Sequence, residues 1–210
     1  MMIDRPLVKI TSSNINRAIM AGLSSGCVAN DPASDNAHKQ IRNHKGPGKP
    51  MTDAERLAAI EDIKALFARR IRAMDTKDWA LYDTCHTDDA TLDSFGTLPE
   101  QHKPAGSIAR GKDQILAMIQ KVVDGKVKVT TVHHAHMPEI EITGPATARG
   151  IWAMEDLLWW QNGAVEEHLH GWGHYHETYE KIAGRWLIKS RQLTRLKVES
   201  TPDFQSYYDK

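Results

Sequence analysis

The fold is decided by residues 146–199, which read ATARGIWAMEDLLWWQNGAVEEHLHGWGHYHETYEKIAGRWLIKSRQLTRLKVE. Runs with alternating or β-rich composition cover 146–160, 164–181 and 185–199, and the turn sequences QNG and IAG separate them. A similar run covers 127–143 and is followed by TGP. Such runs between short turns are typical of neighbouring antiparallel strands. We therefore expect four long strands that form a meander.

Upstream of these strands the pattern is helical. Thr52 and Glu55 form a capping box just before an apolar-periodic run, which predicts a helix that ends near residue 74. A second helix is expected to begin near Trp79, a short strand to cover 90–95, and a third helix to follow Gly111. The inward face of the first helix is expected to carry Leu57, Ile60, Ile63, Phe67, Ile71 and Met74. Helices followed by an antiparallel meander predict an α+β fold: a cone-shaped barrel in which three N-terminal helices pack on a strongly curved sheet, with a pocket inside.

The first fifty residues differ in composition from the rest of the chain. Residues 1–50 lack sustained periodicity, are rich in Ser, Asn, Gly and Pro, and end in NHKGPGKP. This composition predicts a flexible or loosely packed extension, and the domain is expected at 51–210. The stretch AIMAGLSSGC could also end a secretory signal, but its apolar run is short and polar residues interrupt the approach to it. The cytoplasm is therefore the favoured compartment.

Charge and cysteine content exclude several classes of protein. The chain has 210 residues, with 27 Lys and Arg against 27 Asp and Glu. A balanced chain has no bulk field for nucleic acid or an anionic membrane, and no apolar run is long enough for a transmembrane helix. Cys27 and Cys85 lie far apart without a CxxC spacing, which argues against a disulfide framework or a thiolate zinc site. The neutral charge favours an uncharged, ring-shaped ligand.

Two polar residues of the first helix are candidates for a site. Arg70 lies on the apolar stripe between Phe67 and Met74, so its guanidinium either finds a carboxylate or polar cavity or extends to water. Asp75 falls at the helix end, where the macrodipole disfavours a carboxylate. Its position indicates either a role in a site or an ordinary turn role.

The strand run adds further candidates. His133 shares the face of the valines at 127 and 129, whereas His134 lies on the other face. A histidine that pairs with a carboxylate such as Asp75 is a general base, although a satisfied core histidine is the more common case. Asp156 shares its face with Trp152 and Met154, and is either an edge residue or a carboxylate directed into a pocket.

The late histidines form two His-x-His pairs. His168 with His170, and His174 with His176, each place two imidazoles on one strand face, and such pairs can chelate zinc, iron or nickel. A histidine row on the outer face is the alternative. In that case Tyr175 points into the pocket. Arg191 on the last strand could hold a substrate oxygen or carboxylate, or lie exposed at the surface.

The order of several motifs resembles one family. IEDIKALFARRIRAMDTKDWALYDTCHTDDATLD at 60–93, the ARGKDQI helix entry, VHHAHMPEIEI, TARGIWAME and GHYHETYEKIAGRWLIKS together resemble SnoaL-like domains of the nuclear-transport-factor-2-like superfamily. The resemblance covers about residues 52–199. It implies the same cone-shaped fold, and assembly as a dimer or trimer through the outer sheet face.

The resemblance also implies site residues. Asp75 matches the catalytic aspartate shared by scytalone dehydratase, bile-acid 7α-dehydratase and hexachlorocyclohexane dehydrochlorinase, and His133 matches its histidine partner, with His134 as the alternative if a one-residue bulge is present. Arg70 falls on a polar position of those sites. The remaining matches are a pocket acid, a pocket-wall residue and a cation, at Asp156, Tyr175 and Arg191.

The favoured function is a cofactor-independent lyase, or else an isomerase, that acts on a small hydrophobic ring compound such as a steroid, polyketide or aromatic. His133, held by Asp75, is expected to remove a proton, and Arg70 or Asp156 to assist the departing or developing oxygen. The substrate-binding candidates are Tyr175, Arg191, Trp152, Met154 and His134. No cofactor, metal, nucleic acid or membrane is expected. The alternatives are a non-catalytic binding module for a lipophilic ligand and a metal-dependent enzyme that uses the His-x-His pairs.

Overall fold

The computed structural model describes residues 51–103, 106–204 and 206. The predicted extension at 1–50 and the signal-like stretch within it lie outside the described residues. Helix α2 spans Asp53–Asp75, helix α3 Trp79–Asp83 and helix α4 Lys112–Val123. A 3-10 turn, η1, covers Glu100–His102. None of the helices that the structure describes is long and apolar enough to cross a membrane.

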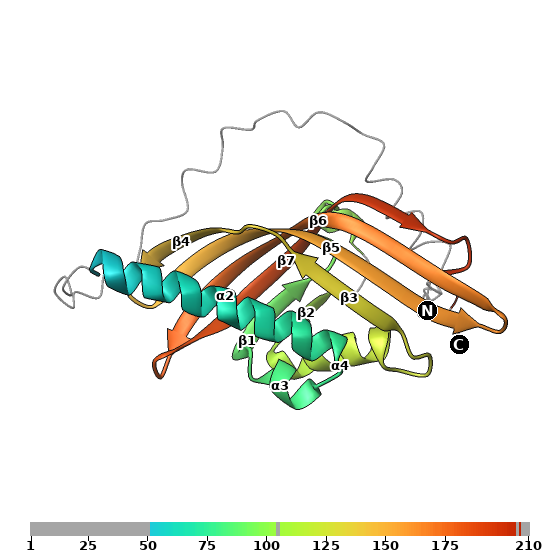
Figure 1. Ribbon diagram of the computed structural model, residues 1–210, viewed down its shortest axis with the longest axis horizontal. Coiled ribbons are helices and arrows are strands. Elements are labelled where there is room, and N and C mark those ends of the chain that lie inside the picture. The colour runs from blue at the N-terminus through green and yellow to red at the C-terminus, as the bar shows by residue number, and fades with distance from the viewer. Residues whose placement is uncertain (1–50, 104–105, 205, 207–210) are drawn as a thin grey trace, which may run out of the picture.

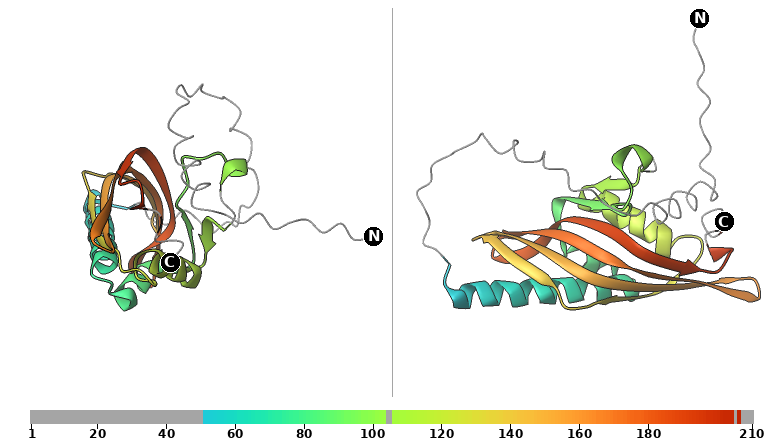
Figure 2. Two further views of the ribbon diagram at one scale, coloured as in Figure 1. Left: turned by 90° about the vertical axis from the view of Figure 1, so that its right-hand side faces the viewer. Right: turned by 90° about the horizontal axis from the view of Figure 1, so that it is seen from above.

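Seven strands form one sheet in the order β2-β1-β7-β6-β5-β3, and β4 also pairs with β5. All neighbours are antiparallel except β1 and β7. The sheet curls without closing into a barrel, and α2 lies along one of its faces (Figures 1 and 2). The predicted α+β fold is confirmed. The strands are β1 His86–Asp93, β2 Ile108–Arg110, β3 Thr130–Ala135, β4 Glu139–Gly144, β5 Thr147–Asn162, β6 Val165–Ile182 and β7 Arg185–Ser200.

Helix α2 begins as its sequence predicts. The Thr52 hydroxyl accepts the backbone N–H of Glu55 at 3.2 Å, and the Glu55 carboxylate accepts the N–H of Thr52 at 2.7 Å. The helix ends at Asp75, where Lys77 adopts a left-handed backbone with φ 59° that turns the chain out of the helix. The capping box and this turn therefore place Asp75 at the tip of the helix.

Four details of the sequence prediction are wrong. The run 127–143 is two strands, because Pro138 lies at the break between β3 and β4 and has no N–H for the ladder. Strand β1 begins at His86 and not at residue 90, and the short strand β2 was missed. Leu57 is 64% exposed, because at about 100° per residue it lies roughly 120° around α2 from the buried Ile63.

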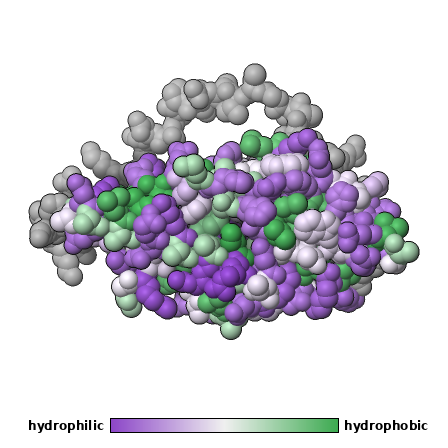
Figure 3. All heavy atoms as spheres, viewed as in Figure 1, coloured by the Kyte–Doolittle hydropathy of each residue, from purple (hydrophilic) through white to green (hydrophobic). Residues whose placement is uncertain are grey.

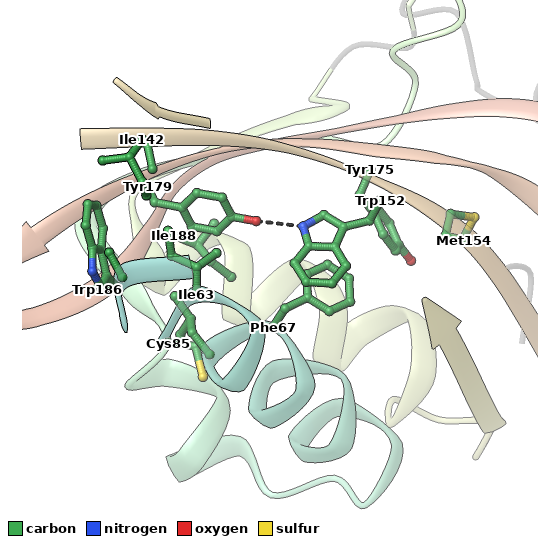
Figure 4. Close-up of a cluster of buried hydrophobic side chains, with 13 residues drawn as sticks. Ile63, Phe67, Cys85, Ile142, Trp152, Met154, Tyr175, Tyr179, Trp186 and Ile188 are labelled. Carbon is green, nitrogen blue, oxygen red and sulfur yellow. Dashed lines mark hydrogen bonds between the residues drawn. The ribbon is translucent and has the colours of Figure 1, made fainter. Parts of the chain in front are cut away.

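The core forms where α2 meets the inner faces of β5 and β6. Phe67 stacks on Trp152 with ring centroids 3.9 Å apart, and the indole N–H of Trp152 donates to the hydroxyl of Tyr179 at 2.8 Å (Figure 4). On the face of the molecule shown in Figure 3, hydrophobic residues are instead scattered among hydrophilic ones. The aromatic stack therefore fixes the position of α2, and with it Asp75, on the sheet.

Candidate active site

Asp75 and His133 are in direct contact. Nδ1 of His133 lies 2.6 Å from Oδ1 of Asp75, and the backbone N–H of His133 donates to Oδ2 at 2.9 Å. The side chain of His133 is 8% exposed and that of Asp75 is 21% exposed. When Nδ1–H donates to a carboxylate, Nε2 keeps the lone pair of the imidazole. Nε2 forms no hydrogen bond with any of the described residues, so this nitrogen is available to a ligand.

Two residues that the sequence analysis missed hold the carboxylate in place. The Thr131 hydroxyl donates to Oδ1 of Asp75 at 2.9 Å, and Lys77 Nζ donates to the Thr131 hydroxyl at 3.1 Å. Burial raises the pKa of Asp75, but the hydrogen bonds and charge of His133, together with the Thr131 hydrogen bond, outweigh it and bring the pKa below its usual value. Asp75 is therefore a carboxylate that orients His133. The signal in the sequence was that Thr131 lies two residues before His133, on the same strand face.

His133 lines a cavity of about 270 Å³ inside the curled sheet. Asp156, Tyr175, Arg191 and Arg195 also line it. Most of the wall is apolar and comes from β1, α4, the C-terminal segment and the ends of β5 and β6, including Leu92, Leu98, Ile119, Leu158, Leu169 and Phe204. A mainly apolar cavity with a few convergent polar groups is typical of a small-molecule site.

A second, larger cavity of about 910 Å³ lies away from His133. Charged pairs on its wall already satisfy one another: Lys103 Nζ lies 2.6 Å from Asp93, and Arg149 Nη2 lies 2.5 Å from Glu141. The Asp75–His133 pair does not reach this cavity. The smaller cavity is therefore the candidate active site.

Asp156 is the cross-strand neighbour of His133 and forms a bidentate ion pair. Arg195 Nη1 and Nη2 each donate to one oxygen of Asp156 at 2.6 Å. A Cβ on Gly171, the neighbour of Asp156 on β6, would lie 2.2 Å from Nη1 of Arg195, so the pair needs glycine there. In this geometry both oxygens of Asp156 accept hydrogen bonds from Arg195. Arg195, which is not one of the predicted site residues, is thus part of the site.

The other predicted residues lie behind the wall or outside it. Arg70 is fully buried, and its Cζ lies 4.6 Å from the Phe67 ring centroid. Trp152 and Met154 are buried but do not line the cavity. His134 points to the opposite face of the sheet, where its ring lies 3.4 Å from Glu155. The one-residue bulge that would have exchanged it with His133 does not form, because β3 pairs with β5 in continuous register.

The late histidines lie on the outer face of β6. His170 Nε2 lies 2.5 Å from Glu155, and the ring centroids of His174 and His176 are 6.2 Å apart. Tyr175 and Glu177, which alternate with them, are buried. Within the described part of the chain, no three His, Cys, Asp or Glu side chains cluster closely enough to hold a metal ion. These histidines therefore form a row on the outer face of the sheet, which was the alternative to a metal site.

Close to the cavity, His86 is 6% exposed and its Nδ1 lies 3.1 Å from the carbonyl oxygen of Tyr82. Burial, and then the charges of Arg191 and Arg70, lower the pKa of His86 to about 3. In the unfolded chain the imidazole takes up a proton near pH 6.5, so the folded state binds fewer protons between these values. The stability contribution of neutral His86 is therefore fully present above about pH 6.5 and decreases as the pH falls towards 3.

We expect His86→Gln to flatten the acid limb of the stability profile. Between about pH 7 and pH 4, the variant should lose roughly 3 kcal/mol less unfolding free energy than the wild type. Urea unfolding at a series of pH values measures this difference. Parallel stability profiles for the two proteins would show that His86 is not held neutral by its surroundings.

Comparisons with known proteins agree with the observed fold. A model of the SnoaL-like domain family matches residues 55–192. A scytalone dehydratase-like protein of Novosphingobium aromaticivorans superposes with a TM-score of 0.59 at 16% identity, over 70% of this chain and 91% of that one. A type 3 hexachlorocyclohexane dehydrochlorinase of Novosphingobium barchaimii gives a TM-score of 0.60 at 16% identity, over 72% and 95%. At these identities the superpositions show a shared fold.

Proposed function

Because this chain belongs to the family of SnoaL-like domains, whose fold it shares with dehydratase-like and dehydrochlorinase structures, we propose that it is a cofactor-independent lyase or isomerase. The observation that carries the proposal is the 2.6 Å contact between Asp75 and His133 at the wall of an apolar cavity. A binding module would have no need for a carboxylate that orients an imidazole towards its ligand.

The proposed reaction begins with Nε2 of His133. This atom takes a proton from a carbon next to an electron-withdrawing group, while Asp75 stabilises the imidazolium that forms. In a lyase reaction the electron pair of the broken C–H bond forms a double bond and expels the leaving group from the neighbouring carbon. The leaving group is either a halide ion or a hydroxide, which takes the proton from the His133 imidazolium and departs as water. In an isomerase reaction the proton returns to another carbon. In this proposal Arg191 and Tyr175, which line the cavity, orient the substrate.

The cavity limits the size of the substrate. Its volume of about 270 Å³ is near the lower end of the range for ligand pockets. A cavity at this end of the range is suited to a compound with one or two fused rings. Among the substrates that the sequence analysis considered, we therefore propose small aromatic or polyketide-like compounds.

Incubation in D₂O tests the proposal. A panel of one- and two-ring compounds with a hydroxyl or halide next to an acidic C–H bond is incubated with the full chain, and products and recovered substrates are analysed by mass spectrometry. We expect turnover, or deuterium uptake at a single carbon, by the wild type and not by His133→Ala. Turnover that persists equally in His133→Ala would contradict the proposal, and so would complete absence of chemistry across the panel with ligands that bind.

A further inference from the structure

The region around Tyr175, on and behind the wall of the cavity, has more positive than negative charge. Three guanidinium groups, those of Arg70, Arg191 and Arg195, act electrostatically on Tyr175. The Cζ atoms of Arg70 and Arg191 lie 5.1 and 5.5 Å from the centroid of the Tyr175 ring. The carboxylates in the same region are Asp156 and Glu177.

Each of these carboxylates already has a partner, and Oε1 of Glu177 has no hydrogen bond among the described residues. Asp156 is bound at both oxygens by Arg195. Glu177 accepts a hydrogen bond from the Tyr179 hydroxyl at 2.7 Å, and its other oxygen lies 3.9 Å from Nη2 of Arg70. Arg191, the cross-strand neighbour of Glu177, has no carboxylate within 4 Å among the described residues. One positive charge is therefore left without a counter-ion.

Hydrogen-bond donors of Arg70 and Arg191 are also unsatisfied. Nη1 of Arg191 and all three guanidinium nitrogens of Arg70 are buried without a hydrogen-bond partner in the described part of the chain. The nearest partner of Nη2 of Arg191 is the Tyr82 hydroxyl, at 3.5 Å. Arg191 is only 6% exposed, and it lines the cavity. Burying an unpaired cation is costly, so a protein keeps one where a bound group neutralises it.

The neighbouring titratable groups His86 and Tyr175 do not change this charge. His86 lies close enough for Arg191 and Arg70 to lower its pKa to about 3, after the larger effect of burial, so it adds no further cation there at neutral pH. Burial and Asp156 raise the pKa of Tyr175, so this phenol stays neutral as well. The excess charge is that of one arginine.

We propose that the ligand of this cavity carries a negative charge, such as a carboxylate on a one- or two-ring compound, and that Arg191 binds it. The inference rests on the proposed function in placing the ligand next to His133. The balanced composition of the chain suggested an uncharged ligand. The net charge is a sum over all residues, however, whereas the cavity wall contains a local excess of positive charge, so we propose a charged ligand instead.

Two probes of the same shape test this inference. Naphthalene-2-carboxylate and naphthalene-2-carboxamide are titrated calorimetrically into the full chain near neutral pH at fixed ionic strength. We expect the carboxylate to bind at least about tenfold more tightly than the amide, as charge-assisted pairing with arginine requires. Equal affinities, or failure of both probes to bind at millimolar concentration, would overturn the inference.

A matched pair of variants identifies the arginine. Arg191→Met should abolish the preference for the carboxylate, whereas Arg185→Met, at an exposed position at the start of the same strand, should retain it. Arg191→Met should also unfold at a temperature no lower than the wild type, because it removes an uncompensated buried charge. A large drop in unfolding temperature, or failure to fold, would show that Arg191 is structural and would overturn the inference.

His133→Ala separates this inference from the proposed function. We expect this variant to keep the preference for the carboxylate, because binding the anion does not require the base. A chain that prefers the carboxylate but has no His133-dependent chemistry would refute only the proposed function. A chain with that chemistry and no preference between the two probes would refute only the inference.

Discussion

His133→Ala is expected to lower kcat by about 10³-fold on a substrate identified by deuterium uptake, while the protein still folds. The physical reason is that the variant lacks the only imidazole on the wall of this cavity among the described residues. General-base catalysis contributes typically about 10²–10⁴-fold to a rate. Steady-state kinetics measure the loss, and circular dichroism confirms the fold.

The neighbouring histidine provides the control. His134→Ala removes the same side chain from the opposite face of the same strand, where the ring is 53% exposed. This variant should retain kcat within about twofold, since surface substitutions have small effects. A comparable loss in both variants would indicate that the strand, and not the imidazole at 133, is needed for activity.

Asp75→Asn is expected to lower kcat by a similar factor. An amide can donate to Nδ1 of His133 and so stabilise the opposite tautomer, with the proton on Nε2. Full activity of Asp75→Asn would exclude Asp75 as the group that orients the base. Thr131→Val should give a smaller decrease, because the hydroxyl supports Asp75 with one hydrogen bond of 2.9 Å.

Phe67→Ala is expected to destabilise the protein by about 3–5 kcal/mol, the range for deletion of a buried aromatic side chain. Phe67 is 1% exposed, stacks on Trp152 and packs against Arg70. Chemical denaturation measures the change in the free energy of unfolding. Leu57→Ala on the same helix is the matched control and should change it by less than about 0.5 kcal/mol, because Leu57 is 64% exposed. Equal effects in the two variants would contradict the described packing of α2.

Local sequence patterns predicted most of the fold. The capping box marked the start of α2, and the turn sequences QNG and IAG marked the ends of β5 and β6. The missed elements depend on tertiary contacts. Strand β2 has three residues and pairs only with β1, so its sequence has no periodicity to detect.

The candidate site was predicted only in part, because some of its contacts join residues that lie far apart in the sequence. Alternation along a strand places His133 and His134 on opposite faces, and the family resemblance indicated which of them lies inside. Periodicity could not show that Asp156 binds Arg195 through the space left by Gly171, since the three residues lie on different strands. It also could not show that the charges of the cavity wall do not balance.

The tautomer of His133 is the most direct test of the central claim that Asp75 orients this imidazole as a base. Nitrogen-15 NMR of histidine-labelled protein reports which ring nitrogen carries the proton, and the His133→Ala spectrum identifies the signal. The account predicts that the neutral ring has its proton on Nδ1, hydrogen-bonded to Asp75, with Nε2 unprotonated towards the cavity. A proton on Nε2 of the neutral ring would contradict it.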